Sequence, residues 1–576
     1  MRRVLIVLAG ALAIGAARVP DPEPAYDVLI VNGLVYDGAG GAPYRGEVAI
    51  RGDRIAFTGV HAPERTAART LDAHGLAIAP GFVNMLAHPE ASLMADGRAL
   101  SDLTQGVTLE VMGEDSMAPI TDKVATLEAA RQGDIRFPVD WRNLDQYFHR
   151  MEAHGIGPNI ATFVGAGTVR TDVLGEGDVQ PTPAQLDEMR GLVRQAMQDG
   201  ALGLTTALIY SPNEYARTPE LIALAKESAD CGGIYIAHMR SEGDRLLEAV
   251  DEEVQIARAS GAPAEIYHLK ESGQSNWDKL DPLIAKVEAA RASGTRITAD
   301  MYTYTAGATG LDAAMPPWVQ DGGLEAWIAR LKDPAIRARV IAEMRSRPKD
   351  WENLYWHAGP ERTLLLAFKT DRLKPLTGKT LAEAAKLRGE SPEDTAIDLV
   401  IEDGTRIEVA YFLMSEDNVR RQMALPWVGF GSDEAAPAPE GVFLKANNHP
   451  RAYGNFARIF AKYVREDHAL SVQEAVRKLT TLPADNLSLP DRGRLKAGAF
   501  ADVVVFDPAT FQDHATYDKP HQLSTGVQDV IVNGRFALAD GKPTGALPGR
   551  AVRSRSWTGA PGGGCRKSPT DWTWHG

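Results

Sequence analysis

The sequence predicts an α/β protein with three parts: a TIM-like (β/α)8 barrel, a small β-sandwich domain built from both chain ends, and an insertion after the seventh barrel strand. Two observations support this prediction. Apolar strand-like runs alternate with helical stretches through the middle of the chain, and short alternating strands occur near both ends. At 576 residues the chain is long enough for one large barrel and a smaller domain.

The small domain is predicted from residues 26–80 and 481–550. Both regions hold short runs of alternating apolar residues broken by turns, and each contains the same four residues, Ile30-Val-Asn-Gly33 and Ile531-Val-Asn-Gly534. We therefore expect the two chain ends to contribute strands to one β-sandwich.

The barrel is predicted over residues 81–480, where strands alternate with helices and therefore run parallel. Helical apolar spacing marks residues 183–198, 219–229 and 245–259 as outer helices. Eight runs are strand candidates, the number that closes such a barrel: 79–88, 107–113, 159–165, 202–208, 234–240, 265–270, 297–304 and 427–433. Residues 306–425 are too long for a crossover and form the insertion, either a lid with specificity loops or a packing appendage.

The two ends of the chain carry further signals. Arg2 and Arg3 precede an apolar stretch over residues 4–17, so residues 1–25 are expected to be a signal peptide of an exported, periplasmic or secreted protein. An N-terminal membrane anchor is the alternative, and no other segment is apolar enough to span a membrane. The Gly-rich residues 551–576 are expected to form a flexible tail.

Charge and cysteine content narrow the class of partner. The net charge of −14 and the lack of a dense Lys/Arg run argue against a nucleic-acid surface, so a small-molecule substrate is expected. Cys231 and Cys565 are too few for a disulfide framework, although a bridge between them stays open. The oligomeric state is not set by the sequence.

Three candidate functional residues lie at the carboxyl ends of predicted strands. His238 ends the run 234–240, His268 ends the run 265–270, and Asp433 ends the run 427–433. A single histidine at a strand end is more often structural, but three polar residues at equivalent places on parallel strands indicate a common site. Two imidazoles and a carboxylate delivered in this way predict a metal-dependent hydrolase, with Asp433 free to move protons.

The chain resembles the D-aminoacylase or N-acyl-D-amino-acid deacylase family of the metal-dependent amidohydrolase superfamily. The resemblance runs from about residue 26 to residue 550 and depends on the order of its motifs. These are Ala79-Pro-Gly-Phe-Val, Gly106-Val-Thr, Val164-Gly-Ala-Gly-Thr-Val-Arg170, Ala237-His-Met-Arg-Ser-Glu-Gly243, His268-Leu-Lys270, Tyr302-Thr-Tyr-Thr-Ala306, Gly431-Ser-Asp433, His449-Pro-Arg-Ala-Tyr-Gly454 and Asp491-Arg-Gly-Arg-Leu-Lys-Ala-Gly-Ala-Phe-Ala-Asp502.

The resemblance implies roles for these residues. His238 and His268 would bind a catalytic zinc ion, and Asp433 would act as general base and then general acid. Further residues would hold the acyl oxygen or carboxylate of the substrate: Lys270, Tyr210, Arg451, His449 and Tyr304. For Lys270 a salt-bridged structural role is the alternative, and His449 could instead contact Asp433 or stabilise its loop.

Two positions depart from the family pattern. The superfamily usually carries His-x-His after the Pro-Gly-Phe turn, whereas this chain reads Leu86-Ala-His88, which leaves His88 as a weaker candidate ligand. Many members place a cysteine ligand after the second strand, whereas this chain has Glu114 and Asp115. Either carboxylate could bind zinc. Glu114 is favoured because it shares strand parity with Thr108 and Glu110.

These residues together predict one zinc ion per chain, with a second, weaker site open. The expected activity is hydrolysis of the amide of an N-acyl amino acid, D-configured by the resemblance alone, or of a related small amide. A dipeptidase, cyclic-imide hydrolase or carbamate hydrolase could use the same site, since a fold does not set its substrate. A non-catalytic binding protein on a degenerate barrel is the remaining alternative.

Overall fold

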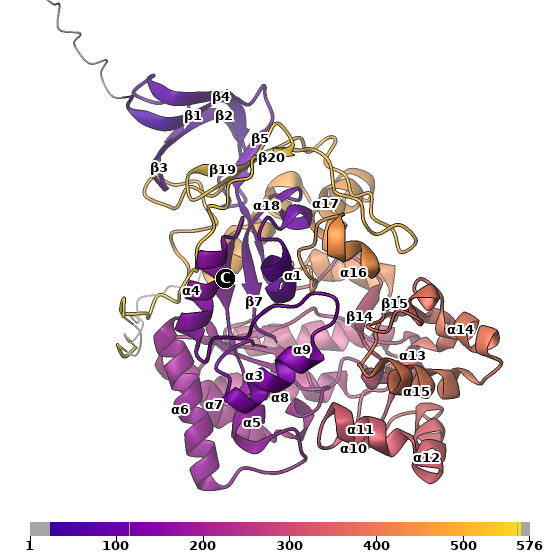
Figure 1. Cartoon of the computed structure of the whole chain (residues 1–576). Coiled ribbons are helices and arrows are strands. Elements are labelled where there is room, and N and C mark those ends of the chain that lie inside the picture. Colours follow the sequence, from indigo (N-terminus) through magenta and orange to yellow (C-terminus); the bar gives the residue numbers. More distant parts are fainter. Residues whose placement is uncertain (1–23, 115, 561–562, 566–576) are drawn as a thin grey trace, which may run out of the picture.

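The computed structural model describes residues 24–114, 116–560 and 563–565 and shows an α/β protein with several sheets (Figure 1). The predicted signal peptide lies almost wholly outside the described residues, and Asp115 lies outside them too. Export and any role of Asp115 therefore stay predictions. Among the residues that are described, no helix is both long enough and apolar enough to cross a membrane.

One nine-stranded sheet, at the top of Figure 1, takes strands from both chain ends. Its halves join where β17 pairs antiparallel with β5, from Val503 opposite Pro80 to Phe506 opposite Ala77. The strands are β1 (Tyr26–Val35), β2 (Tyr44–Arg51), β3 (Arg54–Gly59), β4 (Ala67–Asp72), β5 (Ala77–Pro80), β17 (Val503–Phe506), β18 (Val527–Val532), β19 (Arg535–Ala539) and β20 (Lys542–Pro543). A two-layer sandwich packing of this sheet stays a prediction.

A set of parallel strands occupies the middle of the chain. They form two sheets. In hydrogen-bonded order, one contains β6 (Phe82–Asn84), β7 (Val107–Met112) and β8 (Asn159–Thr162), and the other contains β9 (Val164–Gly165), β10 (Gly203–Ala207), β11 (Ile234–His238), β12 (Ala264–Ile266) and β13 (Ile297–Ala299). Val428 forms a parallel bridge with Ala299 of β13. On its other side, the same segment accepts a hydrogen bond from Met85 at Phe430, 3.2 Å long. Residues 428–430 thus lie between β13 and the chain that follows β6.

Helices occur where the apolar spacing predicts them, as α6 (Pro183–Asp199), α7 (Thr218–Asp230) and α8 (Leu246–Ser260). Helix α6 begins at a capping box formed by Thr182 and Gln185, and Gly200 ends it with φ +110°. The other helices of this region are α1 (Glu90–Ala95), α2 (Leu100–Leu103), α3 (Asp122–Arg131), α4 (Leu144–His154), α5 (Ala166–Leu174), α9 (Leu280–Ala292), α17 (Arg451–Arg458), α18 (Val472–Leu479) and α19 (Thr481–Asn486).

The segment between β13 and Val428 has its own antiparallel sheet and its own buried cluster, which includes Trp327 and Tyr411. Its helices lie on one side of the molecule, at the right of Figure 1. The elements are β14 (Ala306–Gly310), α10 (Pro317–Gln320), α11 (Leu324–Leu331), α12 (Pro334–Met344), α13 (Leu354–Ala358), β15 (Thr363–Ala367), α14 (Leu381–Arg388), α15 (Pro392–Asp403), β16 (Glu408–Phe412) and α16 (Glu416–Met423). The segment also lines the cavity described below, so it is more than a packing appendage.

The first residues of the expected flexible tail contact the rest of the chain. Val552 donates a backbone hydrogen bond of 2.7 Å to Ile160 of β8, and Arg553 lies over the ring of Phe148 at 4.8 Å. Farther along, Cys565 forms a disulfide with Cys231 at the end of α7. The packed part of the chain therefore continues beyond residue 550.

Candidate metal centre

Glu114, His238 and His268 come together from three different strand ends. Glu114 follows β7, His238 is the last residue of β11, and His268 follows β12. Each offers one ligand atom, and these atoms lie within 4.8 Å of one another. All three side chains are buried. The structure thus brings together both predicted histidines and the favoured one of the two predicted carboxylates.

A second group with the same spacing contains His88, Glu114 and Asp433. Glu114 belongs to both groups: its Oε1 lies 3.3 Å from Nδ1 of His238, and its Oε2 lies 3.2 Å from Nε2 of His88. Burial raises the pKa of Glu114, but hydrogen bonds from His238, His268 and His88 outweigh it and hold the pKa well below its ordinary value. This carboxylate is therefore charged and placed between the two groups.

The backbone at two of these residues is in an unfavourable conformation. His268 has φ +36° and Asp433 has φ +53°, in the left-handed region that non-glycine residues rarely adopt. The His268 N–H donates 2.9 Å to Oδ1 of Asp300, and the Asp433 N–H donates 2.8 Å to the carbonyl of Leu86. Held conformations of this kind cluster at functional sites.

Asp433 lies between a histidine and an arginine. Its Oδ1 is 3.2 Å from Nε2 of His88, and its Oδ2 is 2.9 Å from Nη1 of Arg451, which is 1% exposed and lies 4.4 Å above the ring of Tyr302. Burial raises the pKa of Asp433, but the charge of Arg451 and the hydrogen bond from His88 lower it below its ordinary value. An ionised carboxylate in the second group of candidate ligands can accept a proton there.

Glu242, which sequence reasoning missed, is buried next to these residues. Its Oε1 lies 2.6 Å from Nζ of Lys270 and 2.9 Å from Nδ1 of His268, and its Oε2 lies 3.7 Å from Nε2 of His238. Glu242 thus orients His268, lies near His238 without a hydrogen bond to it, and neutralises Lys270. Glu242 lies four residues after His238 in the motif Ala237–Gly243, and this position is the sequence feature that could have indicated its role.

The site opens into a cavity of about 110 Å³. Lys270 and Tyr210, two of the predicted substrate contacts, line it, and the Tyr210 hydroxyl accepts a hydrogen bond of 2.8 Å from Thr309 Oγ1. Arg406 lines the same cavity and pairs with Asp312 at 2.8 Å. Sequence reasoning missed Arg406 because it comes from the inserted segment.

Three of the predicted substrate contacts are not among the residues that line this cavity. Arg451 pairs with Asp433 and is not among the residues that line this cavity. His449 accepts 3.1 Å from the Arg451 N–H, and its Nε2 is 3.1 Å from the Tyr517 hydroxyl, so it supports Arg451. Tyr304 packs edge-on against His449 with ring centroids 5.3 Å apart, while Tyr302 reaches the cavity.

The donor set suits a divalent metal such as zinc, whose usual ligands are imidazole nitrogens and carboxylate oxygens. His238 gives the clearest indication of a metal site, because its buried Nε2 has no hydrogen-bond partner among the described residues and is therefore available to bind a metal ion. Leu86, at the place of the family's first histidine, is fully buried among apolar residues that include Tyr267. A Cβ at Gly431 would lie 2.7 Å from both the N and the Cβ of Leu86, so this glycine makes room for the backbone at position 86.

Two overlapping groups of candidate metal ligands, one of which contains an ionised aspartate, are typical of a metal-dependent hydrolase. Comparison with known proteins specifies the family. The family model described as the amidohydrolase family matches residues 69–537. N-acyl-D-glutamate deacylase of Alcaligenes xylosoxydans xylosoxydans is 33% identical, covering 93% of this chain and 98% of that protein. D-aminoacylase of the same organism is 31% identical, covering 92% and 98%.

A solved structure agrees with these relatives. N-acyl-D-glutamate deacylase from Bordetella bronchiseptica, complexed with zinc and a phosphonate that mimics the tetrahedral intermediate, superposes with a TM-score of 0.75 at 28% identity. The match covers 92% of this chain and 100% of that chain. The protein belongs to the amidohydrolase family, in the branch of the D-aminoacylases and N-acyl-D-amino-acid deacylases, as its sequence motifs predict.

Proposed function

We propose that this protein is a zinc-dependent hydrolase of N-acyl-D-amino acids, which cleaves the amide bond between the acyl group and the amino acid. The proposal depends on one observation: Glu114 belongs to both groups of candidate metal ligands, and the second group also contains the ionised Asp433. The named activities of the relatives supply the substrate class and its D-configuration.

One zinc ion is expected to be held by Glu114, His238 and His268, and His88 with Asp433 could complete a second, weaker site. A zinc ion bound there would polarise the scissile carbonyl and make a water molecule more acidic. The side chains around it do the remaining work. Glu242 fixes the orientation of His268, and Lys270 balances the charge of Glu242.

Asp433 is expected to move the proton. Kept ionised by Arg451, it can take a proton from the attacking water and later deliver it to the departing nitrogen, so that the amino acid leaves as a neutral amine. Without this proton the nitrogen would have to leave as an amide anion, which is a poor leaving group. Arg451, which packs on the ring of Tyr302, positions Asp433 through their ion pair.

The carboxylate of the substrate requires a cation near the cavity. Lys270 and Arg406 both line it, and each is paired with a carboxylate. The pair of Lys270 with Glu242 is buried, whereas the Arg406 side chain, paired with Asp312, is 45% exposed and can be reached by a substrate. We therefore assign the substrate carboxylate to Arg406, with the hydroxyl of Tyr210 beside it. Arg406 lies 4.9 Å from the ring of Tyr210, so the two side chains form one wall.

The proposal extends to the fold and the compartment. We infer that the parallel strands and residues 428–430 close a (β/α)8 barrel whose carboxyl-end loops carry the site. We also infer export to the periplasm or medium, for which the N-terminal apolar stretch and the Cys231–Cys565 disulfide are supporting observations. Fractionation of cells that express the full-length chain tests the compartment: recovery of the chain only in the cytoplasm would refute it.

The activity is tested on zinc-loaded protein with matched N-acetyl-D- and N-acetyl-L-amino acids. We expect release of the D-amino acid from several substrates and a loss of about 10³-fold or more in kcat in the Asp433→Asn variant, with zinc content unchanged. Wild-type protein that releases no amino acid from any N-acetyl-D-amino acid would contradict the proposal.

A further inference from the structure

A cleft of about 650 Å³ adjoins the metal-site cavity and shares His88 and Arg406 with it. A smaller cavity of about 380 Å³ overlaps both, because Asp433 of the metal-site cavity and Ala435 of the cleft line it together. The cleft is therefore a continuation of the metal site, and a substrate held at the metal ligands can extend into it.

Apolar side chains from three separate parts of the chain line this cleft. They come from the loops on either side of α3, from the inserted segment, and from the 3-10 helix Gly441–Lys445. They include Met117, Phe137, Leu324, Phe368, Val442 and Phe443. All of these except Phe368 are only half-buried, so part of their apolar surface stays open to water. A ligand that covers this surface with a hydrocarbon group gains binding free energy.

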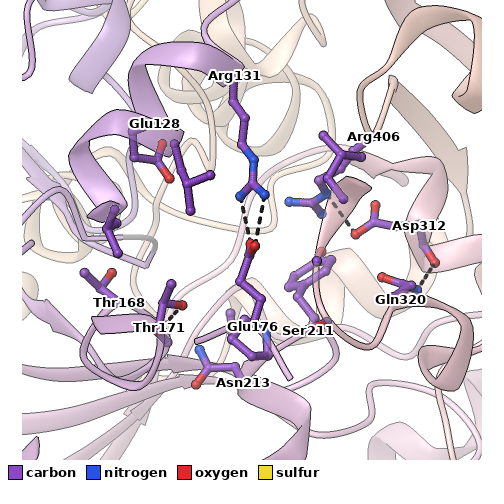
Figure 2. Close-up of a pocket in the computed structure, with 18 of the residues that line it drawn as sticks. Glu128, Arg131, Thr168, Thr171, Glu176, Ser211, Asn213, Asp312, Gln320 and Arg406 are labelled. Carbon is purple, nitrogen blue, oxygen red and sulfur yellow. Dashed lines mark hydrogen bonds and ion pairs between the residues drawn. The ribbon is translucent and has the colours of Figure 1, made fainter. Parts of the chain in front are cut away.

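Charged side chains also line the cleft, four acidic and four basic apart from one histidine. Arg406 is one of them and lies where the cleft meets the metal-site cavity, so it keeps its assigned role in binding the substrate carboxylate. Figure 2 shows Arg131 joined to Glu176, at 2.7 Å, and Glu176 lines the adjoining cavity of about 390 Å³ rather than the cleft. Asp134 is joined to Lys445 at 3.1 Å. The lining has no excess of either charge, so its apolar side chains select the group that enters.

The size of the cleft indicates which part of a substrate occupies it. At about 30 Å³ for a group the size of a water molecule, the cleft has room for about 20 such groups, and the metal-site cavity of about 110 Å³ has room for about four. The largest amino-acid side chain, that of tryptophan, is much smaller than the cleft. An acyl group has no such upper limit of length, so a hydrocarbon acyl chain is the part that can fill it.

We propose that this cleft binds a long, apolar acyl chain of the substrate. The inference rests on the proposed function and narrows it: the preferred N-acyl-D-amino acids carry a hydrocarbon acyl group of about eight carbons or more rather than an acetyl group. The scissile amide then lies at the metal ligands and the carboxylate at Arg406. The acyl chain runs past His88 into the cleft and covers Val442 and Phe443.

Three substrates separate the acyl chain from the amino-acid side chain as the occupant. N-acetyl-D-leucine has no long group, N-octanoyl-D-leucine has a long acyl group, and N-acetyl-D-2-aminodecanoate has a side chain of similar length. Each methylene that is buried improves binding by a factor of about four, so N-octanoyl-D-leucine should exceed N-acetyl-D-leucine in kcat/KM by about 100-fold or more. Equal values for these two compounds would overturn the inference, and so would a gain confined to N-acetyl-D-2-aminodecanoate.

Phe443→Ser locates the gain in the cleft. The substitution removes an apolar wall of the cleft, so it should lower kcat/KM for N-octanoyl-D-leucine about tenfold and leave that for N-acetyl-D-leucine within about twofold. Leu444→Ser is the matched control, because Leu444 is the next residue of the same 3-10 helix, is 54% exposed and does not line the cleft. If Phe443→Ser fails to fold, Val442→Ser provides the same test. An equal loss on both substrates, or the same loss in Leu444→Ser, would contradict the inference.

Binding separates failure of this inference from failure of the proposed function. Calorimetric titration of zinc-loaded Asp433→Asn protein with the same three compounds needs no turnover. Tighter binding of N-octanoyl-D-leucine, weakened by Phe443→Ser and not by Leu444→Ser, supports the inference even if the wild-type protein hydrolyses none of the compounds. Equal affinity for N-octanoyl-D-leucine and N-acetyl-D-leucine, whether or not the wild-type protein is active, refutes it.

Discussion

Glu242→Gln should destabilise the protein by leaving Lys270 as a buried charge without a carboxylate. The pair is 2.6 Å apart, and Lys270 is 6% exposed. Removing one partner of a buried ion pair typically costs about 3–5 kcal/mol. For 576 residues, about 2.1 cal/mol/K per residue gives an unfolding entropy of about 1.2 kcal/mol/K. The melting temperature should therefore fall by about 2.5–4 °C.

The assay is thermal unfolding in the presence of a chelator, so that metal affinity does not contribute. Asp230→Asn is the control, because Asp230 and Lys226 form an exposed pair 3.0 Å apart on α7, and its loss should change the melting temperature by less than about 1 °C. Adding Lys270→Met to Glu242→Gln removes the unpaired charge and should recover most of the loss. The reasoning fails if Glu242→Gln melts with wild type, or if the double variant melts no higher than the single one.

Three further substitutions have defined outcomes. Burial, with a smaller contribution from nearby Asp300, raises the pKa of Glu265 from 4.5 to about 8, so the folded state holds a proton that the unfolded state releases. The contribution of Glu265 to stability is therefore present below pH 4.5 and is lost as the pH rises through about 8. In the wild-type protein this loss lowers the melting temperature across that pH range, and Glu265→Gln should make the decrease smaller. An unchanged slope of melting temperature against pH would contradict this reasoning. Gly431→Ala should destabilise by about 1–3 kcal/mol in urea unfolding, because its Cβ would meet Leu86, and wild-type stability would show that the strand can shift. Leu86→His should raise bound zinc above the wild-type content, measured by elemental analysis; no change would mean that more than one residue closes the second site.

Much of the site could be predicted because its residues lie at the ends of apolar, strand-like runs. His238, His268 and Asp433 each end an apolar run, and the carboxyl ends of parallel strands gather at one place. Strand parity also favoured Glu114, which the structure places between both ligand groups. Parity stops being informative where a strand ends: β13 stops at Ala299, so the sequence could not tell that Tyr302, rather than Tyr304, reaches the cavity.

The residues that sequence reasoning missed come from irregular or distant segments. Arg406 precedes β16 in the inserted segment, about 170 residues after His238 in the chain, and no periodic pattern links them. Glu242 lies in the loop after β11, where its contact with Lys270 depends on how two loops meet. Val552 is likewise held by a hydrogen bond to Ile160, which lies far away in the sequence. The Gly-rich composition of this end of the chain gives no indication of that contact.

Zinc titration of metal-free protein, followed by hydrolysis of an N-acetyl-D-amino acid, is the most direct measurement. Activity should rise from near zero and approach its plateau at about one zinc per chain, and His238→Ala should bind less zinc and stay inactive. Full activity in metal-free protein, or an active His238→Ala variant with no bound zinc, would contradict a zinc amidohydrolase built on Glu114, His238 and His268.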